Sequence, residues 1–128
     1  MRIKVLSALF VASCLLVVPA SAHHGSSFYD LTKTVASKVT VTSLQWENPH
    51  CTLNFDIRDE QGVVAHWSVV MENPSYMSRA GWSRDTLKAG DEITISFHPA
   101  KNGRNIGYIR QGDGKVIFKG RNLTLAQE

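Results

Sequence analysis

The feature that most constrains this fold is the segment CTLNFDIRD at residues 51–59, in which apolar and polar residues alternate. Successive side chains of a β-strand point to opposite faces, so this pattern predicts a strand with one buried face. The apolar face carries Cys51, Leu53, Phe55 and Ile57. Because Cys51 falls on that face, we expect it to be a buried core thiol. The following DEQG predicts a hairpin connection to a second strand, VVAHWSVVME at residues 63–72.

Further alternating segments lie on either side of this hairpin. SKVTVTSLQW at residues 37–46 and EITISFHP at residues 92–99 both predict strands. After the strand predicted at residues 63–72, the segment NPSYMSRAG interrupts the alternation. We predict a short helix over Pro74–Ala80 with Asn73 as its cap. IGYIRQ and KVIFKG predict a final hairpin around GDG. We expect His66 and His98 to face solvent, because each alternates with an apolar neighbour.

The order of three strands, a short helix and two or three strands predicts the fold class. It indicates an all-β protein with one short helix, built as a small five-stranded Greek-key barrel of the OB type. An open β-sandwich with the same strand count is the alternative. We expect an N-terminal arm at residues 23–34, the barrel domain at residues 35–122 and a C-terminal tail at residues 123–128, in which TLAQE is frayed.

The first 22 residues have the layout of a secretory signal peptide. Arg2 and Lys4 precede an apolar run from Val5 to Val18, and Ala20-Ser21-Ala22 provides a small-residue cleavage site. We therefore expect a periplasmic or secreted protein that begins at His23 and has no membrane span after cleavage. The alternative is a lipoprotein anchored through Cys14, although the residues after Cys14 are strongly apolar, whereas that segment is usually polar.

Removal of the leader changes the charge and the cysteine count. The whole chain has a formal net charge of +3, and loss of two cations with no acid lowers it to +1. A charge so close to zero argues against a nucleic-acid partner. Cys51 is then the only cysteine of the mature chain, so no internal disulfide can form and the fold depends on its hydrophobic core.

A cleaved terminus at His23 suggests a metal site. The α-amine and ring of His23, with a third nitrogen from another histidine, would make the nitrogen-rich set that suits Cu(II). His50 is the first candidate for that third nitrogen. His24 and Glu72 are weaker partners for the metal, Glu72 through its carboxylate. The alternative is that HHGSS is a polar leader with no ligand role.

No catalytic motif is recognisable in the sequence, and we expect no enzymatic activity. His50 and Cys51 are neighbours on a strand and point to opposite faces, so they do not form a nucleophile and base. Nucleophile-elbow, phosphate-loop and dinucleotide patterns are absent from the sequence. We expect Trp67 to fill the core, whereas Trp46 and Trp82 are candidates for a ligand-binding face.

Several segments resemble one family of small exported bacterial proteins, the domain of unknown function 6152. They are HHGSSFYD, WENPH, MENP, RAGWSRDTLKAGDEITI and PAKNG, and the similarity extends over residues 23–120. The resemblance implies an exported, barrel-like domain and no established activity. We therefore expect an exported binding or accessory module for an unknown small ligand or protein partner. The alternative is a periplasmic copper-binding protein that uses the mature N-terminal histidine.

Overall fold

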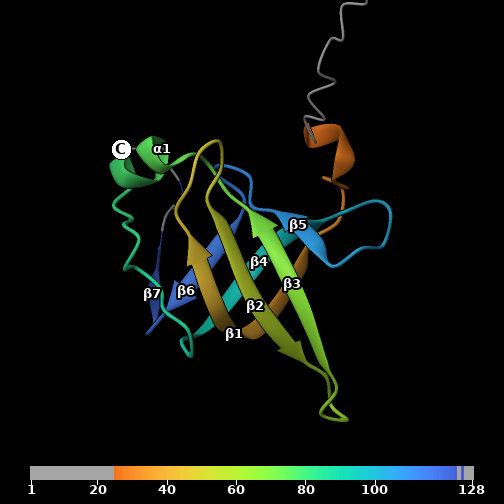
Figure 1. Cartoon of the computed structure of the whole chain (residues 1–128). Helices are drawn as coiled ribbons and strands as arrows, with labels where there is room; N and C mark the ends of the chain where they lie inside the picture. Colours follow the sequence, from red (N-terminus) through yellow and green to blue (C-terminus); the bar gives the residue numbers. More distant parts are fainter. Residues whose placement is uncertain (1–24, 124, 126–128) are drawn as a thin grey trace, which may run out of the picture.

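The computed structural model describes residues 25–123 and residue 125, whose strands form one continuous sheet (Figure 1). The first elements are η1 (Ser26–Phe28), β1 (Val35–Gln45), β2 (Thr52–Arg58), β3 (Val64–Val70) and α1 (Pro74–Arg79). They are followed by β4 (Glu92–Pro99), β5 (Ile106–Tyr108), β6 (Lys115–Phe118) and β7 (Arg121–Asn122). Within this part of the chain, no helix is both long and apolar enough to cross a membrane.

Strand β1 closes the sheet into a barrel because it pairs with two strands. Its first half, Val35–Thr40, is antiparallel to β4, and Thr40–Gln45 is antiparallel to β2. Strand β3 pairs with β2 and, in parallel, with β5, and β5 pairs with β4. The closed order β1-β2-β3-β5-β4, with α1 between β3 and β4, confirms the predicted OB-like barrel in place of the open sandwich.

The barrel interior is filled by the apolar side chains that the alternation predicted. In the alternating segment 51–59, which contains β2, the side chains of Cys51, Leu53 and Phe55 are each at most 1% exposed. Burial raises the pKa of the Cys51 thiol, which is free and surrounded by core side chains. Trp67 packs against this core with its ring 5.2 Å from that of Phe97. The prediction for Cys51 is therefore confirmed, whereas Trp67 is partly buried and packs against the core without lying fully within it.

Helix α1 covers one end of the barrel and ends one residue earlier than predicted. The Asn73 side chain accepts a hydrogen bond from the Tyr76 backbone N–H at 2.9 Å, which is the expected N-cap contact. Pro74 occupies the first turn, where its missing N–H has no cost. Met77 is fully buried and fixes the helix to the core.

The predicted final hairpin is wrong. Strands β5 and β6 do not pair with each other but both lie antiparallel along β4, β5 at His98–Pro99 and β6 at Ile93–Ser96. They act as one barrel strand that is interrupted by the loop 109–114. Strand β6 instead pairs with the short β7, which a tight turn at Lys119–Gly120 places beside it. Local turn signals could not distinguish these two pairings.

The segments on either side of the barrel domain also pack against it where the structure describes them. The Asp30 N–H donates to the Pro99 carbonyl at 2.8 Å, and the Lys101 N–H donates to the Phe28 carbonyl at 3.1 Å. Between these contacts, Tyr29 is 5% exposed. In the expected tail, Leu125 is 3% exposed and belongs to the core, so the prediction of a frayed end is wrong for that residue.

Candidate functional site: a charged groove on the outer barrel face

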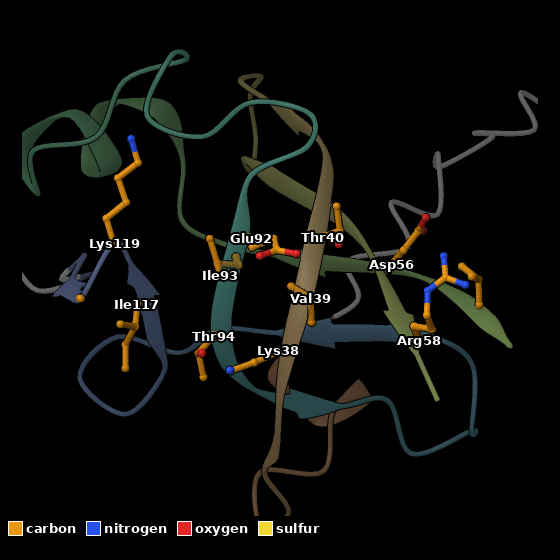
Figure 2. Close-up of a pocket in the computed structure, with 12 residues that line it drawn as sticks. Lys38, Val39, Thr40, Asp56, Arg58, Glu92, Ile93, Thr94, Ile117 and Lys119 are labelled. Carbon is orange, nitrogen blue, oxygen red and sulfur yellow. The ribbon is translucent and has the colours of Figure 1, made fainter. Parts of the chain in front are cut away.

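A groove of about 530 Å³ lies on the outside of the barrel where β1 changes its pairing partner. Thr40 marks this point, because it is opposite both Asp56 of β2 and Glu92 of β4. The groove is lined by Lys38, Val39, Thr40, Asp56, Arg58, Val64, Glu92, Ile93, Thr94, Ile117, Lys119 and Gly120. Figure 2 shows Asp56 and Arg58 on one side of β1, and Ile117 and Lys119 on the other.

The strand register arranges the outward side chains of the groove in two neighbouring rows across the strands. We call the first the acidic row, and its central members are Asp56, Thr40 and Glu92 on β2, β1 and β4. Its outer neighbours are His66, opposite Asp56 on β3, and Lys119, which follows β6. The His66 Nδ1 lies 2.5 Å from Asp56 Oδ1.

The second row, which we call the basic row, lies two residues further along each strand. It contains Arg58 of β2, Lys38 of β1 and Thr94 of β4, and Lys38 is directly opposite Thr94. At its ends, Val64 is opposite Arg58 on β3 and Ile117 is opposite Thr94 on β6. The alternate residues of these strands point into the core, so the same alternation that builds the barrel presents these charges outward.

Most of the charged side chains in the groove are not paired with each other. Among residues 25–123 and 125, Lys38, Arg58, Glu92 and Lys119 take part in no ion pair. Arg58 donates one hydrogen bond, to the Gly62 carbonyl at 3.0 Å, and the Lys119 ammonium lies 5.0 Å from the Phe118 ring. The groove therefore holds cations and a carboxylate whose charges are available to a ligand.

The tryptophans predicted to form a ligand-binding face are not in this groove. Trp82 is 4% exposed and belongs to the core, so an exposed face with both rings does not exist. Its burial follows from the turn after α1, where the Trp82 N–H donates to the Met77 carbonyl at 2.9 Å. Trp46 is partly buried and packs against the same core.

The predicted metal ligands are only partly within the described residues. His23 and His24 lie outside them, and His50 is exposed in the connection between β1 and β2, after a cis Asn48–Pro49 bond. In the described part of the chain, no group of three or more histidine, cysteine or acidic side chains is placed to hold a metal ion. His66 is exposed, as predicted, with an 83% exposed side chain.

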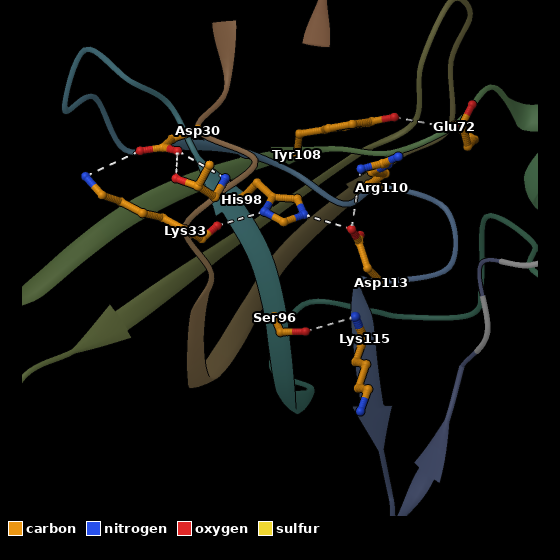
Figure 3. A network of polar contacts seen from close by, with 10 residues as sticks. Asp30, Lys33, Glu72, Ser96, His98, Tyr108, Arg110, Asp113 and Lys115 are labelled. Atoms are coloured by element: carbon orange, nitrogen blue, oxygen red, sulfur yellow. Dashed lines mark hydrogen bonds and ion pairs between the residues drawn. The ribbon is translucent and has the colours of Figure 1, made fainter. Parts of the chain in front are cut away.

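The prediction that His98 faces solvent is wrong. His98 does point away from the barrel interior, but the segment before β1 and the loop 109–114 cover it, and it is 6% exposed. Figure 3 shows its ring between these two segments, with Nδ1 2.7 Å from the Lys33 carbonyl and Nε2 3.2 Å from Asp113 Oδ2. Because the Lys33 carbonyl can only accept a hydrogen bond, the His98 Nδ1 is protonated and donates to it. Arg110 lies 3.9 Å from the same Asp113 carboxylate.

Two tyrosines and two acids complete the cluster around His98, which we call the clamp. They are Tyr29, Tyr108, Asp30 and Glu72. The Tyr108 hydroxyl donates to Glu72 at 3.5 Å, and burial and then the Glu72 charge raise the pKa of Tyr108. Its ring lies 5.4 Å from that of Tyr29, whose pKa is also raised by burial. A hydrogen bond from the Thr32 side chain lowers the pKa of Asp30. Together with the contact between His98 and Lys33, the ring contact between Tyr29 and Tyr108 joins the segment before β1 to strands β4 and β5.

We predict that His98→Leu destabilises the protein by about 1–3 kcal/mol, because the Lys33 carbonyl and the Asp113 carboxylate lose their partner. Urea unfolding followed by tryptophan fluorescence measures this loss. Hydrogen exchange of residues 26–34 should accelerate in the same variant. The control is His66→Leu, on the exposed face, which should change the stability by less than about 0.5 kcal/mol. Equal losses in the two variants would show that the clamp has no special role.

The comparison with known families identifies the chain at the level of the family. The model of a family of unknown function, DUF6152, matches residues 11–110. The chain belongs to the DUF6152 family. The match includes β1 to β5 and therefore the central members of both the acidic row and the basic row. Ile117 and Lys119 of the groove lie outside it. No curated protein and no solved structure matches this DUF6152 chain significantly.

The residues of the groove were not identified from the sequence, although their strands were. Lys38, Arg58 and Glu92 are separated by 20 to 54 positions along the chain, and single alternating segments contain no information on which strands become neighbours. The one available signal was the position of these residues on the polar faces of predicted strands. That signal marks every solvent-facing strand residue equally.

Proposed function

We propose that this DUF6152 protein is an exported ligand-binding module and that the outer groove is its binding site. The groove has a volume within the range of about 300–1,000 Å³ that is usual for small-molecule sites. Its central residues lie on the regular strands β1, β2 and β4, which hold these side chains on a rigid framework. This position replaces the tryptophan face that the sequence suggested.

The observation that carries the proposal is the collection of unpaired charges in one concavity. Lys38 and Glu92 lie on adjacent strands yet form no ion pair with each other or with any other described residue. Charges of both signs within one concave surface allow several charge-assisted hydrogen bonds to a single polar ligand. A flat surface with scattered charges does not offer this convergence.

Chemical-shift mapping tests the proposal. We expect a panel of small polar molecules, added to the ¹⁵N-labelled mature protein, to contain compounds that shift the amide signals of Lys38–Thr40, Asp56–Arg58 and Glu92–Thr94 together. Lys38→Ala and Glu92→Gln should each weaken this binding about tenfold, because each removes a charge-assisted hydrogen bond. A panel that leaves all three segments unshifted contradicts the proposal.

Two matched variants control for general charge effects. Lys101→Ala and Glu60→Gln remove the same charges from exposed positions in turns outside the groove. Neither variant should change the affinity measurably, and all four variants should keep the unfolding midpoint of the parent protein. A loss of affinity in the control variants equal to that in the groove variants would assign the effect to net charge alone.

Copper binding through a mature His23 is the second candidate function. The observation that favours it is the docking of the adjacent segment, in which the Asp30 N–H bonds to the last residue of β4 and the Phe28 carbonyl bonds to the turn that follows. If export cleavage occurs after Ala22, the new terminus would be close to this fixed point in sequence. His24 and His50 would be the further nitrogen ligands.

A Cu(II) titration separates this candidate from the groove. We expect mature protein that begins at His23 to bind Cu(II) at least about tenfold more tightly than the same protein with an acetylated N-terminus, because acetylation removes the α-amine ligand. Mass spectrometry of the exported protein establishes whether it begins at His23 or at a lipid-modified Cys14. Equal Cu(II) affinity of the two forms would contradict the amine site, and it would not affect the groove.

A further inference from the structure

We propose that the groove selects a zwitterionic ligand of dipeptide length, with its ammonium group on the acidic row and its carboxylate on the basic row. This inference rests on the proposed function of the groove and names its ligand class. At the centre of the groove, Asp56 and Glu92 flank Thr40 in one row. Arg58 and Lys38 lie in the neighbouring row, beside Thr94.

The two rows make the groove electrically asymmetric across its width. A purely anionic ligand finds cations in the basic row but faces the carboxylates of the acidic row. A purely cationic ligand meets the opposite difficulty at Lys38 and Arg58. Such repulsion discriminates between ligands as effectively as attraction does. A ligand with one charge of each sign, in the matching orientation, satisfies both rows.

The charges at the ends of the rows do not reverse this asymmetry. In the acidic row, Lys119 lies beyond Glu92, outside the three central strands, and its ammonium contacts the Phe118 ring. At the other end, His66 is bound to Asp56. Glu92 thus remains the carboxylate of the central strands without a described ion-pair partner. The ends of the basic row are the apolar Val64 and Ile117.

The spacing of the rows sets the length of the ligand. The rows are two residues apart along each strand, which corresponds to about 7 Å. Two extended residues span at most about 7 Å, so a dipeptide places its terminal ammonium and carboxylate at that separation. In a free amino acid, both groups are attached to one carbon and cannot reach both rows. Thr40 and Thr94 provide hydroxyls beside the peptide group between the two ends.

Four probes that differ in their end groups or in their length test this inference by calorimetry or chemical-shift titration. They are dialanine with free ends, its N-acetylated form, its C-amidated form and free alanine. We expect dialanine to bind most tightly and each blocked form to bind at least about tenfold more weakly, because each lacks one charge-assisted contact. Free alanine should also bind more weakly than dialanine.

Variants assign each end of the ligand to its row. Glu92→Gln should weaken dialanine binding but leave the binding of the N-acetylated form unchanged, because that form has no ammonium to lose. Lys38→Ala should weaken dialanine binding but leave that of the C-amidated form unchanged. Glu60→Gln and Lys101→Ala should affect none of the four probes.

The outcomes separate this inference from the proposed function. Equal binding of dialanine and either blocked form overturns the zwitterion inference. If no probe binds but another small molecule shifts the groove signals, the inference is wrong while the groove remains a binding site. If neither the probes nor the wider panel shifts these signals, both proposals are wrong.

Discussion

Phe97→Ala is expected to lower the free energy of unfolding by about 3–5 kcal/mol, the usual cost of removing a large buried aromatic side chain. Phe97 is 1% exposed on β4, and its ring lies 5.7 Å from that of Phe55 and 5.2 Å from that of Trp67. These rings come from β2, β3 and β4, so the truncation leaves a cavity where three barrel strands meet. The surrounding strands are held by their pairing and can close this space only partly.

Urea unfolding of the Phe97→Ala variant, followed by circular dichroism, measures the loss. The slope of the unfolding free energy against urea should remain that of the parent protein, because the surface exposed on unfolding is nearly unchanged. Val63→Ala is the control, since Val63 is 63% exposed, and it should change the stability by less than about 0.5 kcal/mol. A loss below about 1 kcal/mol in Phe97→Ala would mean that these aromatic rings do not anchor the barrel.

Gly107→Ala is expected to destabilise the protein by about 1–3 kcal/mol through overpacking. A Cβ atom added at Gly107 would collide with the Phe97 ring, approaching Cε2 to 2.9 Å, and would lie 3.1 Å from the His98 carbonyl oxygen. The cost is steric, because the backbone at Gly107 does not have the positive φ that favours glycine. The glycine allows β5 to approach β4 closely while the ring of Phe97 remains in the core.

A double-mutant cycle checks this explanation. In the Phe97→Ala background, Gly107→Ala should cost much less than in the parent protein, because the ring that it would strike is gone. The unfolding free energies of the parent, both single variants and the double variant define the coupling energy. An equal cost of Gly107→Ala in both backgrounds would show that the conflict lies with the backbone of β4 instead.

Short-range patterns predicted the individual elements of this protein well. The alternation of residues 51–59 gave the buried face of β2, and Asn73-Pro74 gave the start of α1. The order of strands and helix was enough to predict the OB-like barrel, because few topologies accommodate that order. The predictions of single elements depend on residues within about ten positions of one another, whereas the fold class depends on the order of those elements along the chain.

The wrong predictions concern contacts between distant segments. His98 alternates correctly with Phe97, but its outward side is covered by Lys33 and Asp113, which are 65 and 15 residues away. Trp82 follows a turn with no periodic pattern, and only the packing of α1 places it in the core. Whether an outward-facing strand residue is buried depends on which other segments of the chain pack over it. The alternation within the strand contains no information about those segments.

Local sequence patterns were sufficient to specify the secondary structure and the face that each strand buries, since side-chain alternation and capping act between near neighbours. The tertiary structure decided which strands became neighbours and in what register. That register brought Lys38, Arg58 and Glu92 into one groove, where their charges lie in two opposed rows. A shift of one residue would turn these side chains to the interior, so the burial of the core residues between them also positions the candidate site.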